Sequence, residues 1–208
     1  MKITLKPNQE IWITSDTHYD HKNICSATTE WDINSRNVRK FESLDKMNAT
    51  IVNNINNLVK PDDILISLGD WSFNGKNNIA NFRNQIACQN IHLIYGNHDE
   101  HIIKDRGRQF QSLFTSTQQY LELSVDKQQY ILFHYPIASW NNMSKGSIHL
   151  HGHIHFNGSI KLHPKSRSMD VGVDGNNYKP YSFTEINKIM ADRPIGNLTL
   201  PNNTDHHL

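Results

Sequence analysis

Apolar residues recur with two different periods along the first half of the chain, and together they predict alternating strands and helices. Within residues 43–59 they fall at steps of three and four, which is the spacing of an amphipathic helix, and Pro61 follows where that helix has to end. A second helix is expected over residues 77–87. Compact apolar runs predict strands at residues 11–15, 64–68 and 91–95. This alternation is typical of an α/β fold.

The second half of the chain has mainly a strand pattern. A last helix is expected from Ser182 to about Met190, because Ser182 and Glu185 have the spacing of a capping box. We therefore expect a β-rich core with helices outside it, in one domain over residues 1–193 followed by a polar tail over residues 194–208. The strands predicted in this half cover residues 120–125, 130–133, 148–151 and 169–173.

The composition is that of a soluble globular protein, since 37% of the 208 residues are hydrophobic and 20% are charged. No apolar run approaches the roughly 18 residues that a membrane span requires. The N-terminus turns polar at Lys6, so it lacks the apolar core of a secretory signal. These features favour the cytoplasm and argue against a membrane protein.

The charge and the cysteines exclude further classes of protein. A net charge of +1 gives no broad cationic field, so nucleic acid is not the favoured partner. A small phosphorylated substrate remains open, because bound metal ions would supply local positive charge. Cys25 and Cys88 are too few for a disulfide framework or a four-sulfur zinc site, and whether they pair is left open. No pattern indicates an obligate protein partner.

Histidine is the unusual residue in this composition, because it occurs 13 times and is the commonest metal ligand in proteins. Several histidines, together with acidic and amide side chains, come directly after the predicted strands. In α/β sheets this edge is where ligands and catalytic groups gather. We therefore expect one site built from five strand ends, with the candidates Asp16, His18, Asp70, Asn97, His98, Asp99, His134, His153 and His155.

The first three strand ends carry different chemistry. In extended backbone, Asp16 and His18 would project to the same side and hold one ion, while the two oxygens of Asp70 are enough to bridge two ions. Asn97 offers a neutral amide oxygen. His98, as the next residue, would point elsewhere and act as an acid, with Asp99 holding its other ring nitrogen and favouring its charged form.

The histidines of the second half indicate a metal site only when they are considered together. A lone His134 would more often be a satisfied core residue than a ligand. Residues 149, 151, 153 and 155 are all histidine, which on a strand would place four imidazoles on one face. Gly152 is expected to break that strand, so that His153 and His155 reach the metal while the two earlier histidines are structural.

Taken in order, these motifs resemble those of the calcineurin-like metallophosphoesterase superfamily, over roughly residues 11–183. The chain is most similar to small bacterial and phage-type members that continue the first motif as Ser-Asp-Thr-His and end in Val-Gly-Val-Asp, here residues 171–174. The resemblance implies a four-layer α-β-β-α sandwich, in which two mixed β-sheets are flanked by helices. It also implies two metal sites that share Asp70. One would consist of Asp16, His18, Asp70 and His155, and the other of Asp70, Asn97, His134 and His153.

Nitrogen and oxygen ligands without sulfur favour two divalent ions, with Mn²⁺ first and Fe²⁺, Zn²⁺ or Ni²⁺ as alternatives. Two ions that share a carboxylate can bind a bridging hydroxide, which would attack phosphorus in line. His98 would then protonate the leaving oxygen, while Asp99 supports it. His21 and Asn23 follow the first motif and are candidate substrate contacts, together with Lys22.

The expected reaction is phosphodiester hydrolysis on nucleotides or cyclic nucleotides. Residues 71–75 contain no arginine to bind a phosphomonoester dianion, and the third motif ends in Asp99 rather than glutamate, which argues against a protein phosphatase. The alternatives are a phosphomonoesterase or a DNA or RNA nuclease of the same superfamily. A different class is a non-catalytic protein-binding scaffold, although scaffolds usually lose a ligand or the acid histidine.

Overall fold

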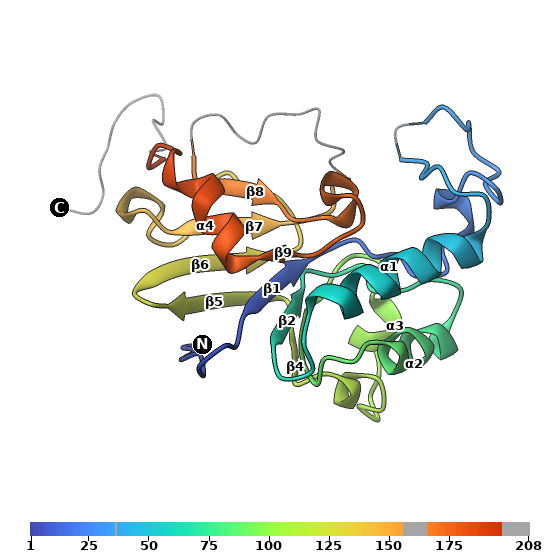
Figure 1. The fold of residues 1–208 in the computed structure, drawn as a ribbon, viewed down its shortest axis with the longest axis horizontal. Coiled ribbons are helices and arrows are strands. Elements are labelled where there is room, and N and C mark those ends of the chain that lie inside the picture. The colour runs from blue at the N-terminus through green and yellow to red at the C-terminus, as the bar shows by residue number, and fades with distance from the viewer. Residues whose placement is uncertain (36, 156–165, 197–208) are drawn as a thin grey trace.

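The computed structural model describes residues 1–35, 37–155 and 166–196, which form two packed β-sheets (Figure 1). The first sheet has the strand order β4-β3-β2-β1-β9 and the second has the order β5-β6-β7-β8. The strands of the first sheet are β1 (Ile11–Thr14), β2 (Ile64–Ser67), β3 (Asn90–Ile94), β4 (Ser116–Gln118) and β9 (Tyr181–Ser182). The strands of the second sheet are β5 (Tyr120–Val125), β6 (Gln128–Phe133), β7 (Ile148–His151) and β8 (Ser168–Asp170).

Both sheets are mixed, and their parallel strands set the direction of the site. β1, β2, β3 and β4 run parallel, with Ile13 of β1 opposite Ile66 of β2, while β9 is antiparallel to β1. In the second sheet β6, β7 and β8 run parallel and β5 is antiparallel to β6. The carboxyl ends of the parallel strands therefore meet at one edge of each sheet.

Alternate residues of the strands build the core between the two sheets. Ile11 and Ile13 of β1 pack with Leu132 of β6 and Leu150 of β7 in one buried cluster. The intervening Trp12 packs instead against the cluster on the other face of the first sheet. This alternation follows from the two-residue period of a strand, and it makes both faces of the first sheet apolar.

Helices cover the outer face of the first sheet, on the side away from the second sheet (Figure 1). They are α1 (Leu44–Leu58), α2 (Lys76–Gln85) and α3 (Glu100–Ile103). α1 begins where the Ser43 hydroxyl accepts a hydrogen bond from the Lys46 N–H, and it buries the apolar stripe predicted from the sequence. α4 (Phe183–Ala191) follows β9 and packs Phe183 and Ile186 into the core between the sheets.

The expected fold of two mixed sheets flanked by helices is confirmed. The capping box at the start of α4 is also formed, with both of its bonds between Ser182 and Glu185. The sequence did not predict β4, β9 or α3, which have two to four residues each. The described part of the chain also contains four short 3-10 helices that the sequence did not predict: η1 (Lys22–Ile24), η2 (Gln111–Leu113), η3 (Met143–Lys145) and η4 (Val173–Asn176).

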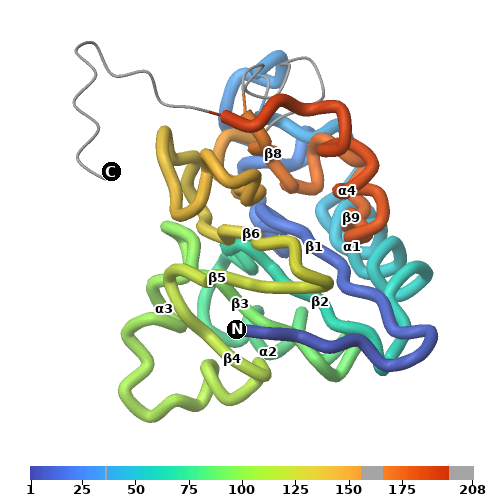
Figure 2. Tube along the Cα trace, turned by 90° about the vertical axis from the view of Figure 1, so that its left-hand side faces the viewer, coloured from blue at the N-terminus to red at the C-terminus, as the bar shows by residue number. Residues whose placement is uncertain are grey.

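The termini, the cysteines and the hydrophobicity of the helices can also be compared with the expectations from the sequence. The N-terminal segment pairs with β5, where the Ile3 N–H donates to the Ser124 carbonyl at 3.1 Å (Figure 2). Cys25 and Cys88 are both buried and are not joined in a disulfide. None of the described helices has the length and hydrophobicity needed to cross a membrane. Of the expected polar tail, residues 197–208 lie outside the described part of the chain.

Candidate metal centre

The seven predicted metal ligands converge at one place, although they come from five separate loops. The first sheet supplies Asp16 and His18 after β1, Asp70 after β2 and Asn97 after β3. The second sheet supplies the others from the loops after β6 and β7, namely His134, His153 and His155. The centre therefore lies across the junction of the two sheets, at the carboxyl ends of their parallel strands.

The first group of donors consists of Asp16, His18 and His155. The Nε2 atoms of His18 and His155 lie 3.0 Å apart, and Asp16 Oδ1 lies 4.0 Å and 3.9 Å from them, respectively. Each of the three side chains offers one ligand atom, and these three atoms all lie within 4.8 Å of one another. That spacing is compatible with a single ion whose ligand bonds are about 2.0–2.2 Å long.

The second group of donors surrounds His134. Asn97 Oδ1 lies 2.9 Å from His134 Nε2 and 3.0 Å from His153 Nδ1. Asp70 Oδ2 lies 3.6 Å from His134 Nε2 and also 3.6 Å from His18 Nε2 in the first group. Asp70 is therefore the carboxylate between the two groups of donors, which is the position expected of a bridging ligand.

The second group is suited to a cation. His134 Nδ1 lies 2.7 Å from the Leu68 carbonyl, to which it donates, so the lone pair of the neutral imidazole is on Nε2. That lone pair faces the oxygens of Asp70 and Asn97, so acceptors point at one another. A divalent ion would satisfy all three at once, and nitrogen and oxygen donors without sulfur are those of Mn²⁺, Fe²⁺ and Zn²⁺ sites.

The backbone of the ligand loops is unusual. Five of the seven predicted ligands have positive φ angles, between 47° and 72°, which non-glycine residues rarely adopt: Asp16, His18, Asp70, His153 and His155. The expected extended backbone at Asp16 and His18 is therefore wrong, because β1 has already ended at Thr14. Their side chains converge through left-handed turns instead, and strained residues of this kind cluster at functional sites.

Glycine allows the loops from the two sheets to approach closely. A Cβ atom on Gly152 would lie 2.0 Å from Ser15 Oγ and 2.3 Å from Asp16 Oδ2, so a larger residue would push the loops apart. As expected, β7 ends at His151, one residue before this glycine. The His153 N–H then donates to the carboxylate of Asp16 at 3.0 Å, which joins the second sheet to the first.

Burial dominates the electrostatics of the centre. It raises the pKa of Asp70 to about 8, with the charge of Asp16 adding to the effect. Burial also lowers the pKa of His18 well below its usual value, and the nearby His155 lowers it further. His155 differs, because its hydrogen bond to Asp174 and the charge of Asp16 outweigh the burial and raise its pKa. Buried acceptors and carboxylates thus repel one another in the absence of a cation.

His98 lies at the exposed rim of the centre. Its ring centroid is 5.6 Å from that of His18 and 4.7 Å from that of Phe73. The backbone N–H of His98 donates to Asp70 Oδ1 at 2.9 Å. Burial and the charges of His155 and His153 lower its pKa. The sequence predicted the opposite shift, from a contact with Asp99.

Asp99 has a different role from the one expected. Its carboxylate accepts hydrogen bonds from the backbone N–H groups of Gly96, Asp70 and Trp71, at 2.8–3.0 Å. It makes no hydrogen bond to the His98 ring within the described part of the chain. Asp99 therefore joins the loops after β2 and β3, because three convergent amides bind a buried carboxylate more favourably than one exposed imidazole does.

The two predicted substrate contacts differ in where they point. The His21 ring stacks on Phe73 with centroids 3.6 Å apart, and its centroid lies 5.3 Å from that of His18. Burial and the charge of His98 lower its pKa to about 4. The Asn23 amide oxygen accepts from the Glu30 N–H at 3.4 Å, so this side chain supports the loop. His21 alone of the two touches the rings of the centre.

Arg39 lies beside the centre and contacts two of its loops, which the sequence did not predict. The residue is 2% exposed, and its guanidinium donates to both carboxylate oxygens of Asp174, at 2.7 Å and 2.9 Å. It also donates to the carbonyls of Asp16 and Thr17, at 2.6 Å and 2.9 Å. Asp174 Oδ2 lies 3.0 Å from His155 Nδ1. Arg39 therefore positions two ligand loops. In the sequence it stands next to Lys40 with no motif around it, so the sequence did not indicate this contact.

His149 and His151 stay outside the two groups of donors, as expected. His149 Nδ1 donates to the Ile131 carbonyl at 3.0 Å, and its Nε2 accepts from the Ile137 N–H at 3.3 Å. His151 Nδ1 lies 3.1 Å from the Gly152 carbonyl. Burial lowers the pKa of both histidines to about 4, so they are neutral packing residues behind the centre.

Comparison with known proteins identifies a matching family, a similar sequence and a similar structure. Residues 10–170 match the model of the calcineurin-like phosphoesterase superfamily domain. An uncharacterized protein of Methanocaldococcus jannaschii is 29% identical over 187 residues, which cover 88% of this chain and 92% of that protein. A protein of unknown function from Aquifex aeolicus has a crystal structure that is similar with a TM-score of 0.66 at 23% identity, covering 88% of this chain and 100% of that one. That similarity shows a shared fold.

Proposed function

The chain belongs to the calcineurin-like phosphoesterase superfamily, and from this we propose that it is a phosphodiesterase that uses two divalent metal ions, with Mn²⁺ first among them. We propose nucleotides or cyclic nucleotides as its substrates. The observation that carries this proposal is the position of Asp70, whose Oδ2 atom is equally far from a histidine of each donor group. Membership of the superfamily by itself supports hydrolysis of phosphoric esters.

Two ions, when bound, would supply Lewis-acid charge to the phosphoryl oxygens and lower the pKa of a coordinated water molecule. One would be held by Asp16, His18, Asp70 and His155. The other would be held by Asp70, Asn97, His134 and His153.

His98 is the proposed proton donor to the leaving oxygen. It is exposed at the rim of the centre, and its ring stands beside the His18 ring without belonging to either group of donors. A phosphate anion bound there would favour the protonated imidazole, because an opposite charge raises a histidine pKa. Asp99 and Asp70 fix the backbone that carries this ring, through the bonds to Gly96 and to the His98 N–H.

The surroundings favour a diester over a monoester. A monoester carries more negative charge and is commonly bound by a free arginine through two parallel hydrogen bonds. Arg39 reaches this region, but its donors are already bonded to Asp174 and to two backbone carbonyls. The segment from Trp71 to Gly75 beside His98 contains no arginine.

Comparison of two chromogenic esters tests the proposal. With Mn²⁺ added, bis(4-nitrophenyl) phosphate should be hydrolysed with a higher kcat/KM than 4-nitrophenyl phosphate, and chelation should abolish both activities. Preference for the monoester would instead make the protein a phosphomonoesterase. If the metal-bound protein hydrolysed neither ester, nor DNA or RNA, it would be a non-catalytic scaffold. If it hydrolysed only DNA or RNA, it would be a nuclease.

A further inference from the structure

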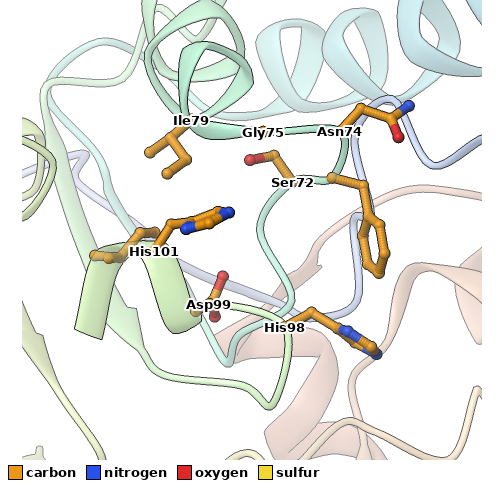
Figure 3. Close-up of a pocket in the computed structure, with 9 residues that line it drawn as sticks. Ser72, Asn74, Gly75, Ile79, His98, Asp99 and His101 are labelled. Atoms are coloured by element: carbon orange, nitrogen blue, oxygen red, sulfur yellow. The ribbon is translucent and has the colours of Figure 1, made fainter. Parts of the chain in front are cut away.

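A cavity of about 130 Å³ opens beside His98, between the loop that follows β2 and helix α3 (Figure 3). Phe73, Ile79 and Ile102 give it apolar walls. Ser72 and His101 place polar atoms in it, and in Figure 3 these two side chains point toward each other across the space. The lining is thus partly apolar and partly polar, and convergent polar groups beside apolar walls are what fixes the orientation of a small ligand.

The Ser72 hydroxyl is the polar group without a partner. The residue is only 9% exposed, and its Oγ atom is buried and makes no hydrogen bond within the described ranges of the chain. A buried polar group left in this state destabilises the folded protein, and a ligand that bonds to it would remove that cost. Asp99 also lines the cavity, but its carboxylate is bonded to three backbone amides and is 2% exposed. The hydroxyl therefore has an unused hydrogen-bonding capacity that the carboxylate does not have, and Figure 3 shows it directed into the cavity.

The cavity is next to the metal centre. His98 and Phe73 line it, and the centroids of their rings lie 5.6 Å and 5.3 Å from that of the ligand His18. The two rings are themselves 4.7 Å apart. A substrate whose phosphate is held by the donor groups can thus reach the cavity by passing over this pair of rings, on the side of the proposed proton donor.

We propose that this cavity binds the nucleobase of the substrate, on the leaving-group side of the phosphate; this rests on the proposed phosphodiesterase function. A nucleobase is flat and fits between apolar walls, while its ring nitrogens and exocyclic groups can bond to Ser72 and His101. The cavity volume of about 130 Å³ is below the roughly 300–1,000 Å³ of pockets that enclose a whole drug-sized ligand, so only part of a nucleotide would enter it. Ser72 and His101 thereby become residues that determine specificity.

The first test compares two cyclic diesters that differ only at the glycosidic position: 2′,3′-cyclic AMP, and methyl β-D-ribofuranoside 2,3-cyclic phosphate, in which a methoxy group replaces the base. The wild-type protein should favour the nucleotide in kcat/KM. The variant Ser72→Ala should lower the ratio of the two kcat/KM values by about 2- to 12-fold, which corresponds to the loss of one hydrogen bond. Ser72→Leu, which fills the cavity, should lower that ratio further. Ser124→Ala, in β5, is the matched control and should keep the wild-type ratio.

A binding measurement separates this inference from the proposed function. Adenosine, which has no phosphate, should perturb the NMR amide resonances of Ser72, His101 and Ile102 in the wild-type protein and should do so less in Ser72→Leu. Perturbations confined to other residues, or a base preference unchanged in both Ser72 variants, would overturn the inference while leaving diester hydrolysis intact. Failure to hydrolyse either cyclic ester would count against the proposed function, and adenosine binding would still decide what the cavity does.

Discussion

At the scale of single residues, His98 can be separated from the metal ligands. It lies at the rim, and the donor atoms that surround the two proposed ions belong to other side chains. The variant His98→Gln should therefore keep its bound metal and lose about 10²–10⁴-fold in kcat on bis(4-nitrophenyl) phosphate. Metal content by elemental analysis and kcat measured on the same preparation would check this.

Asp70→Asn provides the contrast, because this change removes the charge between the two donor groups. It should lose metal as well as activity. If His98→Gln kept the wild-type kcat over the whole pH range, the proton donor would have to be another group.

The candidate ligands could be predicted from the sequence, but their conformations and supports could not. Asp16, His18 and Asp70 follow apolar strands, which is a local signal. Their positive φ angles depend on contacts with the opposite sheet, such as the approach of Gly152 to Asp16. The bonds of Asp99 to backbone amides of its own sheet were missed because the sequence does not show which amides lack partners.

At the scale of elements, long periodic segments were predictable and short ones were not. α1 and α4 carry both an apolar stripe and a capping serine, so two independent signals agree on each. β4 and β9 have three and two residues, too few to show a period, and they exist because neighbouring strands offer free hydrogen-bonding groups. Periodicity also gave no indication of how two sheets would stack, which the family resemblance supplied.

Arg39 joins three separate parts of the fold and should control how firmly the metal is held. It links its own loop to the segment after β1 and to η4 through Asp174, which in turn contacts the ligand His155. Arg39→Lys keeps the charge but loses the planar group that bonds both oxygens of Asp174 and the carbonyls. Loss of such support typically weakens metal binding about 10- to 100-fold, which metal titration calorimetry would measure.

Arg83→Lys is the matched control for this change. Arg83 also donates to three backbone carbonyls, those of Leu113, Ile86 and Gln89, but these belong to the helices and loops on the outer face of the first sheet. It should lose some stability and keep the wild-type metal affinity. Equal metal affinity in both variants would show that Arg39 supports the fold without positioning His155.

At the scale of the whole molecule, the metal centre is a junction between the two sheets. The first sheet contributes Asp16, His18, Asp70 and Asn97, and the second contributes His134, His153 and His155. Ions bound to both sets would act as a cross-link, present in the folded protein and lost when the sheets separate. Binding to the folded state alone stabilises it in proportion to the logarithm of the ligand concentration over the dissociation constant.

Removal of the metal should therefore lower the thermal stability of the entire fold and not of one loop. At an Mn²⁺ concentration about 100 times the dissociation constant, one ion contributes about 2.7 kcal/mol, and a domain of this size shifts its Tm by about 2–4 °C per kcal/mol. Because chelation removes both ions, scanning calorimetry should show a single transition that falls by about 10–20 °C on chelation and recovers when Mn²⁺ is restored. Asp70→Asn should melt near the temperature of the chelated wild type and respond little to added Mn²⁺, because its donor groups no longer share a charge. A response of Asp70→Asn as large as that of the wild type would mean that the stabilising ions bind elsewhere, and the two sheets would then be held together by their apolar core alone.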